Sequence, residues 1–448
     1  MTTDLEADYL VIGAGATAMA FVDELVHCAD SVRILVVERR GGPGGHWNDA
    51  YDFVTLHQPA AFYGVNSRPL GKGGRDLASK DEILDYYRRV QSDLEATGRV
   101  QFFFGCESDG DTAFHDLLNR TSYRVRVSRK IVDSRYMNVT VPSTRPPAFH
   151  VDLTVKCVPI NDLVNSAVEE ERFLVIGSGK TGIDAVLYLL RRGVDPDSIS
   201  WVVPNDAWLL DRSHFFDEGL AHSLEQELRI LKKCKVWHEV FTAYEDSGLF
   251  LRLDPDIEPT RYRCATVTPD ELHALRRIRD VIRLGRILRI DETGVHFEKG
   301  RRAFDAATVY VDCTADGLQR RTPQPIFQPG RIILQPVLLC QPTFSGALVG
   351  MIEAREESLD ELNRLCRPVQ YPHRPVDYFE STLRSLENID VWRVTFGFRL
   401  FRMRLFLASH IRFRRMPKHI LLATLYTRGA VKNLRRFADA VSDESARS

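Results

Sequence analysis

Short apolar runs that end at a glycine occur twice along this chain, each time inside the same longer pattern. The first run, YLVI at 9–12, precedes Gly13, and a helical pattern and a second apolar run follow it. The second run, FLVI at 173–176, precedes Gly177, and the same two features follow it again. Apolar runs of this length that are bounded by turns are typical of strands buried in a parallel sheet. The chain therefore predicts two separate strand–turn–helix–strand units.

Further elements follow from local signals between and after these units. Two capping boxes, SKDE at 79–82 and TPDE at 268–271, predict helices near 80–97 and 269–284, because hydroxyl and acid each bond a backbone N–H of the other's residue. A β-hairpin with Glu-Thr-Gly at its turn is expected around 292–294.

The first glycine turn has the small residues that a dinucleotide-binding turn needs. Gly13, Gly15 and Ala18 occupy the three small positions of G-x-G-x-x-G/A, which allow a sharp turn, a close pyrophosphate and close helix packing. Glu38 ends the second apolar run, where a carboxylate accepts hydrogen bonds from an adenosine ribose. A purely structural turn is the alternative, but the order of the elements favours a dinucleotide. The predicted contacts are Gly13, Gly15, Ala16, Ala18, Glu38 and Arg39.

The second turn, GSGKTG at 177–182, also contains the Gly-Lys-Thr of a triphosphate-binding loop. Such a loop needs a glycine five positions before Gly179, and Leu174 stands there, inside the apolar strand. We therefore interpret this turn as a second dinucleotide site, with Lys180 either at a phosphate or in solvent. The predicted contacts are Gly177, Gly179, Lys180, Thr181 and Gly182.

The second unit lacks an acid at the position where the first has Glu38. Its second strand ends at Pro204 and Asn205. A carboxylate there favours NADH, and an arginine favours the extra phosphate of NADPH. Arg212 could supply that cation, so Asn205 and Arg212 are predicted contacts of NADPH, with NADH as the alternative.

The segment after Glu38 suits a cofactor that carries a reactive ring. GGPGGHWND at 41–49 is a glycine-rich loop whose backbone could pass close to a cofactor, and Trp47 could cover a flavin ring. The residues 51–67 interleave aromatic side chains with His57, Gln58 and Asn66. His57 is the candidate hydrogen-bond donor at the flavin, with a purely structural histidine as the alternative. The predicted cofactor contacts in this segment are Gly45, His46, Trp47 and Gln58.

Taken in order, these motifs resemble the flavin-containing monooxygenases and related flavoproteins with two dinucleotide-binding domains. The order is Gly13-x-Gly15, Gly44-Gly45-His46-Trp47, Gly177-x-Gly179-x-x-Gly182, and a strand that ends in Cys-Thr-Ala-Asp-Gly at 313–317. The resemblance implies FAD contacts at Thr314, Ala315 and Asp316 and a catalytic role for Asn66, which matches an active-site asparagine of the family in position. The family's linker fingerprint before the second turn is missing, which indicates an outlying branch.

The resemblance implies an FAD-dependent oxidoreductase reduced by NAD(P)H. Its most direct form is a monooxygenase that acts on a small organic substrate and molecular oxygen through a flavin C4a-(hydro)peroxide. Two alternatives stay open: a reductase or dehydrogenase without oxygen insertion, and a flavin-binding, membrane-peripheral protein with idle redox chemistry.

The predicted fold class is α/β, with two Rossmann-like domains, the second inserted into the first, and a helical C-terminal segment. Within the second domain, WLLDRSHFF (208–216) and AHSLEQELRILKKCKVW (221–237) predict extra helices that could form a substrate lid. The expected division is an FAD-binding part at 1–167, an NAD(P)-binding domain at 168–305 with an insertion at about 206–275, an FAD-domain return at 306–390 and a basic helical segment at 391–448.

Composition narrows the setting of this chemistry. The net charge of -1 gives the chain as a whole no electrostatic reason to bind nucleic acid. The eight cysteines include no Cys-x-x-Cys, and no metal motif occurs, so we expect isolated thiols, no metal and a cytoplasmic location.

The segment 391–437 departs from this neutral balance, because it contains twelve arginines and lysines and no acid. Such a segment could contact an anionic membrane surface at its periphery. The alternative is a helical layer packed on an acidic face of the same chain. The oligomeric state has no sequence signal.

Overall fold

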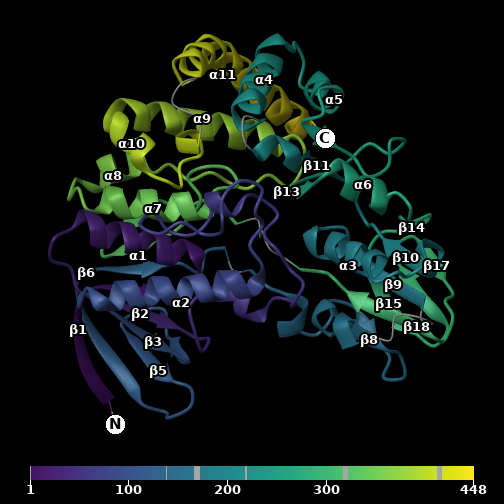
Figure 1. Cartoon of the computed structure of the whole chain (residues 1–448), viewed down its shortest axis with the longest axis horizontal. Helices are drawn as coiled ribbons and strands as arrows, with labels where there is room; N and C mark the ends of the chain where they lie inside the picture. Colours follow the sequence, from purple (N-terminus) through teal and green to yellow (C-terminus); the bar gives the residue numbers. More distant parts are fainter. Residues whose placement is uncertain are drawn as a thin grey trace.

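The computed structural model describes residues 2–137, 139–165, 172–216, 219–315, 321–410 and 416–447. Two sheets lie side by side in its lower half, and a layer of helices covers them at the top (Figure 1).

The first glycine turn belongs to an eight-stranded sheet with the path β19-β20-β6-β1-β2-β3. The neighbours from β20 to β3 on this path are parallel, and the β1 and β2 residues near the turn are buried. Its strands are β1 (Thr2–Ile12), β2 (Ile34–Glu38), β3 (Val100–Phe104), β4 (Cys106–Ser108), β5 (Ala113–Asp116), β6 (Ser122–Asp133), β19 (Phe327–Gln328) and β20 (Arg331–Ile333).

Helix α2 (Lys80–Ala96) accompanies this sheet and begins at the predicted capping box, in which Ser79 and Glu82 bond each other's backbone N–H. Helices α1 (Ala16–Cys28) and α7 (Pro342–Glu353) pack along each other through two glycines of α7. A side chain at Gly346 would lie 2.2 Å from the Thr17 carbonyl oxygen, and one at Gly350 would lie 2.6 Å from that of Phe21. Because both residue numbers rise together along the contact, α1 and α7 run parallel, and both N-termini face the same end of the sheet.

The second glycine turn belongs to a five-stranded parallel sheet with the order β14-β10-β9-β18-β8. Its helices are α3 (Lys180–Arg191) and α6 (Pro269–Leu275). Its strands are β8 (Cys157–Pro159), β9 (Arg172–Ile176), β10 (Ile199–Val202), β14 (Asp280–Ile282) and β18 (Thr308–Asp312). Since β8 precedes residue 167 and β18 follows residue 305, the sheet extends beyond both expected boundaries of this unit.

The inserted segment forms a three-stranded sheet with helices α4 (Gly219–Lys233) and α5 (His238–Asp246). Its strands are β11 (Ala207–Asp211), β12 (Phe250–Leu251) and β13 (Arg261–Val267). The predicted helix at 221–237 is largely confirmed, but the one at 208–216 is wrong: β11 is the central strand, paired on both sides, and only Arg212–Phe215 forms a short 3-10 turn. The predicted helix 269–284 ends early at Leu275, because Asp280–Ile282 pairs with β10.

A small sheet carries the predicted hairpin. Strands β15 (Ile287–Asp291) and β16 (Gly294–Phe297) are antiparallel and are flanked by β17 (Gly300–Arg302) and β7 (His150–Val151).

Two helices precede the C-terminal segment, α8 (Leu359–Leu365) and α9 (Asp377–Phe396), and the end of α9 extends into it. The described part of the segment is helical, as predicted, with α10 (Phe398–Arg402) and α11 (Met416–Arg447). Part of its positive charge binds within the chain: Arg404 donates to the carbonyl oxygens of Ala61 and Tyr63, and Arg435 pairs with Glu387. Among the described residues, no helix has the length and apolar character needed to span a bilayer.

The expectation of isolated thiols fails for one pair. Cys264 on β13 and Cys340, just before α7, form a disulfide although 76 positions separate them. Tertiary packing brings the inserted sheet against the start of α7, which no local spacing could indicate.

Candidate functional site

The first glycine turn lies between two closely packed backbone segments. Gly13 has φ +96°, and a side chain there would lie 2.6 Å from the Ser134 hydroxyl. Gly15 begins α1, and a side chain on Gly45 would lie 2.9 Å from the Gly15 Cα. This contact leaves no room for a Cβ on Gly45. Because no side chain stands between Gly15 and Gly45, the turn presents backbone N–H groups at the positive end of α1. Behind it, Ala14 and Ala18 are fully buried in the core.

Glu38 lies where the sequence predicts a ribose acid, at the end of β2, and it is 4% exposed. Its carboxylate accepts hydrogen bonds from the backbone N–H of Ala14 (2.8 Å) and of Arg40 (3.0 Å). A carboxylate has about four acceptor positions, so it can still bind ribose hydroxyls. The guanidinium of Arg40 bridges Glu38 and Asp49, while Arg39 is exposed. The contact predicted between Arg39 and the cofactor stays a prediction, and Arg40 is an additional arginine that the sequence analysis did not name.

The start of α7 adds a second set of backbone donors. Since α7 runs parallel to α1, its N-terminus lies beside the first glycine turn. There the Gln341 side-chain oxygen is buried and has no partner among the described residues. The residues of this unit therefore fit a dinucleotide. The N-termini of α1 and α7, the glycine turn and the buried carboxylate of Glu38 surround one candidate binding site.

The segment 45–67, which carries several aromatic side chains, forms one wall of this candidate site. The Trp47 indole donates a hydrogen bond to the Tyr63 hydroxyl (3.0 Å), and the His46 and Trp47 rings stack with centroids 5.5 Å apart. Burial, together with the Arg40 charge, lowers the pKa of His46 to about 4. His46 is therefore neutral at physiological pH, and Gln58, farther along the loop, is partly buried.

Asn66 holds the C-terminal segment on the first unit. Its amide donates to the Glu24 carboxylate (2.7 Å) and accepts from the backbone N–H of Leu405 (3.0 Å). Both halves of the amide are thus engaged within the protein, on the side of α1 away from its N-terminus. Its catalytic role stays a prediction.

The second glycine turn repeats the geometry of the first. Gly177 has φ +120°, and its carbonyl oxygen accepts a hydrogen bond from the Trp201 indole (2.8 Å). A side chain on Gly182 would lie 1.9 Å from the same oxygen, so only glycine fits at the third small position. Gly179 begins α3, with Lys180 and Thr181 in the first turn of the helix. An unpredicted residue, Arg263 on β13, has its guanidinium 3.5 Å from where a Gly179 side chain would begin.

The two units meet in a polar network around α3. Lys180 pairs with Asp184, one helical turn later, and the Tyr51 hydroxyl of the first unit donates to the same carboxylate. Burial and this carboxylate raise the pKa of Tyr51 well above its usual value. Neither Tyr51 nor Asp184 was predicted, since each matters only through the other.

His57 lies at this junction. Its backbone carbonyl accepts a hydrogen bond from the Thr266 hydroxyl on β13, and its Nδ1 is buried without a partner among the described residues. Burial, with the Lys180 and Arg212 charges, lowers the pKa of His57 to about 3. A neutral imidazole of this kind can donate or accept a hydrogen bond but does not deliver a proton as a cation at neutral pH.

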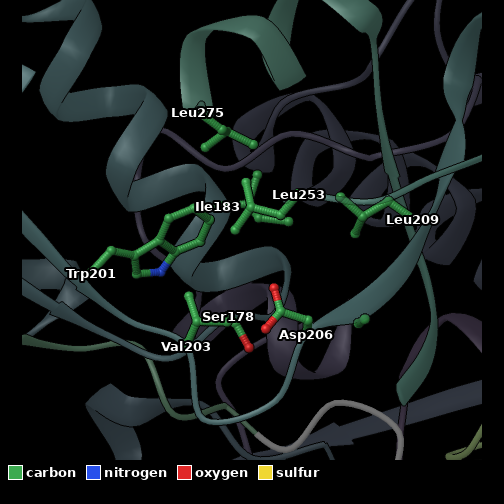
Figure 2. Close-up of a pocket in the computed structure, with 9 residues that line it drawn as sticks. Ser178, Ile183, Trp201, Val203, Asp206, Leu209, Leu253 and Leu275 are labelled. Atoms are coloured by element: carbon green, nitrogen blue, oxygen red, sulfur yellow. The ribbon is translucent and has the colours of Figure 1, made fainter. Parts of the chain in front are cut away.

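Beside the second turn lies a partly open pocket with a single acid, Asp206 (Figure 2). Asp206 follows Asn205 directly and is 8% exposed, and Arg283 donates two hydrogen bonds to its carboxylate (2.8 and 3.1 Å). The Asn205 carbonyl accepts from Ser178 in the turn (3.1 Å). The acid thought to be missing from the second unit is therefore present one residue later. The pocket is lined by Ser178, Ile183, Trp201, Val203, Asp206, Ala207, Leu209, Leu253 and Leu275.

Arg212 does not lie in this pocket. Its side chain is buried and paired with Glu271 of α6, so its charge is already balanced. The role predicted for it at an extra phosphate finds no geometric support.

The strand end that resembles the family's return motif lies against the second turn. The Cys313 carbonyl oxygen is 3.0 Å from where a Gly177 side chain would begin, and Thr314 and Ala315 follow directly. The Thr314 N–H bonds Asp312 (2.8 Å), and its hydroxyl accepts from Arg145 (3.2 Å). Asp316 lies outside the described residues.

Comparison with known proteins yields relatives of high similarity, two of which are named here. The chain is 40% identical over 404 residues to the uncharacterized protein Rv2000 of Mycobacterium tuberculosis, covering 87% of this chain and 75% of that protein. The uncharacterized protein Mb2023 of Mycobacterium bovis matches to the same extent. No protein-family model matches the chain.

Solved structures establish the fold. A complex of OTEMO with FAD and NADP gives a TM-score of 0.53 at 14% identity, covering 80% of this chain and 84% of that one. A closed form of cyclohexanone monooxygenase gives a TM-score of 0.52 at 13% identity, covering 96% of this chain and 98% of that one. A mutant flavin monooxygenase from Stenotrophomonas maltophilia gives 0.50 at 14% identity, covering 81% and 99%. The predicted fold with two dinucleotide-binding domains is thereby confirmed.

Proposed function

Because this chain belongs to the same protein family as Rv2000 of Mycobacterium tuberculosis, and because its fold is that of flavin-dependent monooxygenases, we propose that it is an FAD-dependent oxidoreductase reduced by NAD(P)H. The proposed reaction is monooxygenation of a small organic substrate with molecular oxygen. NADPH is the first coenzyme to test, since neighbours of this fold have been solved with FAD and NADP.

The observation that carries the proposal is the pairing of two equivalent turns in one chain. Each turn has a positive-φ glycine and precedes a helix. A buried acid follows in each unit: Glu38 ends β2, and Asp206 lies in the turn after β10. One turn would hold FAD and the other the nicotinamide coenzyme. Bound FAD would accept a hydride from the coenzyme and pass the electrons to oxygen.

The chain's own residues would bind, orient and shield these groups. Backbone N–H groups at the starts of α1 and α3 would hold the two pyrophosphates. Trp47, Tyr63 and the buried aromatics near them form an apolar wall that excludes water, which any reactive oxygen chemistry requires. His57, neutral and with no partner for Nδ1 among the residues that the structure describes, would supply one hydrogen bond at the meeting point of the units.

The proposed reaction with oxygen is tested by the ratio of oxygenated product and released peroxide to the NADPH consumed. Flavin-loaded protein that has been reduced anaerobically with NADPH is mixed with oxygen, and NADPH use, peroxide release and oxygenated product are measured over a panel of ketones, amines and sulfides. A monooxygenase forms product in proportion to NADPH, and peroxide release falls when a substrate is present. Full conversion of the reducing equivalents into free peroxide with every substrate, together with fast electron transfer to an artificial acceptor, would instead identify a reductase.

A further inference from the structure

The disulfide between Cys264 and Cys340 joins two parts of the chain that meet at the proposed site. Cys264 lies on β13 of the insertion, and Cys340 precedes α7 of the FAD-domain return, with Cα atoms 6.4 Å apart. Among the described residues it is the one disulfide. It is therefore a covalent link between the insertion and the first unit, in addition to their packing.

Both ends of the bridge lead directly to residues of the site. On β13, Arg263 lies over the second glycine turn, and Thr266 donates to the His57 carbonyl. On the other side, Gln341 and Pro342 begin α7 next to the first glycine turn. The position of the bridge thus affects how β13 sits against both turns.

The backbone at Cys340 supports a specific role for this pair. Cys340 has φ +57°, in the left-handed region, and only two other non-glycine residues in the described chain have positive φ. A residue with a Cβ adopts this conformation at an energetic cost, so surrounding contacts must enforce it. Here it accompanies a sulfur directed at Cys264.

The remaining cysteines contrast with the pair. Six are free, and four of these are buried. Burial raises the pKa of Cys28 to about 11 and that of Cys157 to about 12, and it raises the pKa values of Cys313 and Cys366 well above the usual value of a thiol. Such thiols are poor nucleophiles. Oxidation is therefore expected to be selective for the one pair whose sulfurs already lie together.

We propose that Cys264 and Cys340 form a reversible redox site that fixes the insertion against the FAD domain under oxidising conditions. One thiolate attacks a hydroperoxide, cleaving the O–O bond to give a sulfenic acid and water or an alcohol. The second thiol displaces water from that sulfur and forms the S–S bond, so two thiols lose two electrons and two protons to the peroxide. A cellular dithiol reverses the step by attacking the sulfur of Cys340, since Cys340 is the more exposed of the two residues. This site does not depend on the proposed flavin chemistry.

The test is differential alkylation of the full-length protein. Protein reduced with dithiothreitol and desalted is divided, one half is treated with hydrogen peroxide, and both are denatured in an alkylating reagent and analysed by peptide mass spectrometry. We expect all eight cysteines to be alkylated in the reduced half and only the six others in the oxidised half, with a cross-linked peptide joining 264 and 340. Thioredoxin with its reductant should then restore both thiols in the native protein.

Matched variants and a conformational readout complete the test. Cys264→Ser should give the same number of alkylated thiols in the reduced and the oxidised sample. Cys234→Ser, at a buried cysteine in the same core, should have one thiol fewer in each sample, and the two samples should still differ by two thiols. Amide hydrogen exchange in 261–267 should be several-fold slower in the oxidised form. Alkylation of Cys264 and Cys340 after peroxide, resistance of the bridge to thioredoxin in the native protein, or identical exchange in the two forms would each overturn the proposal.

Discussion

Asp206 is the residue on which the choice between NADH and NADPH is expected to depend. A carboxylate that follows the second strand of such a unit can accept hydrogen bonds from free ribose hydroxyls, and it repels a 2′-phosphate. We expect Asp206→Ser to lower kcat/KM for NADH by about tenfold, which corresponds to the loss of one hydrogen bond to a charged group. The same substitution should raise kcat/KM for NADPH. Arg283, still beside Asp254 (3.2 Å), would then be available to the phosphate.

The measurement for Asp206 is binding of ADP-ribose and 2′-phospho-ADP-ribose by calorimetry, which needs no turnover. Asp197→Ser, at an exposed acid of the same unit, is the control and should change neither affinity. An unchanged preference in Asp206→Ser would contradict the assignment of the pocket.

His57 predicts an acid-sensitive fold. Its pKa lies near 3 in the folded chain and at the ordinary 6.5 when unfolded, so the unfolded chain binds more protons between these values. Stability from the neutral histidine is complete above pH 6.5 and falls as the pH drops towards 3, by at most about 2 kcal/mol between pH 6.5 and 5. Urea unfolding of His57→Gln should depend less steeply on pH in this range than that of wild type, whereas the exposed His115→Gln should match wild type. Parallel pH curves for His57→Gln and wild type would contradict the assigned shift.

At this scale, the sequence predicts residues whose role is set by local geometry. Gly13, Gly177 and Glu38 are needed by any chain that makes such a turn, so a pattern identifies them. Asp184 and Tyr51 were not predicted, because the role of each depends on a hydrogen bond to the other, 133 positions away in the chain. Asp206 was missed for another reason: the acid was sought at the strand end, whereas β10 ends at Val202 and Asp206 lies in the turn before β11.

At the scale of elements, the third small position of the second turn is the most constrained. A side chain at Gly182 would meet the Gly177 carbonyl oxygen at 1.9 Å, and this oxygen is a backbone atom that cannot rotate away as a flexible side chain could. Gly182→Ala is expected to destabilise the second unit by about 1–3 kcal/mol and to abolish nicotinamide coenzyme binding while the protein keeps its flavin. Gly42→Ala, where a side chain meets nothing within 4 Å, is the control. Retention of coenzyme affinity in Gly182→Ala, measured by calorimetry, would show that the turn does not hold the coenzyme.

The segment around Arg404 is predicted to anchor the C-terminal helices to the first unit. Its guanidinium is partly buried and donates to the carbonyl oxygens of Ala61, Tyr63 and Val65. Arg404→Met leaves these acceptors unpaired and should cost about 2 kcal/mol or more in urea unfolding. Arg402→Met, at an exposed neighbour, should cost less than about 0.5 kcal/mol. Equal stability of the two variants would mean that the carbonyl contacts contribute nothing to docking.

Elements with a local signal were predicted, and those set by tertiary pairing were not. Both capping boxes begin helices where expected, since side chain and backbone bond within four residues. Strand β11 looked helical because Trp208, Leu209 and Leu210 have no clear alternation, and its pairing with β12 and β13 decides its conformation. A different long-range pairing, that of β14 with β10, accompanies the early end of α6 at Leu275.

For the whole molecule, the sequence predicts the two units because the strand, glycine turn, helix and second strand at the centre of each are consecutive in the chain. Their contact depends on residues far apart in the chain: the Tyr51–Asp184 bond, the Thr266–His57 bond and the Cys264–Cys340 bridge. The central claim concerns this contact, since electrons must cross from a coenzyme on the second turn to a flavin on the first.

The most direct measurement is anaerobic titration of the flavin-loaded protein with NADPH and with NADH, followed by the flavin absorbance. The account predicts that the bound flavin is FAD, that at least one coenzyme bleaches it stoichiometrically, and that Gly182→Ala keeps the yellow colour but is not bleached. A protein that binds FAD yet is reduced by neither coenzyme, while dithionite reduces it fully, would contradict the claim that the two turns form one electron-transfer site.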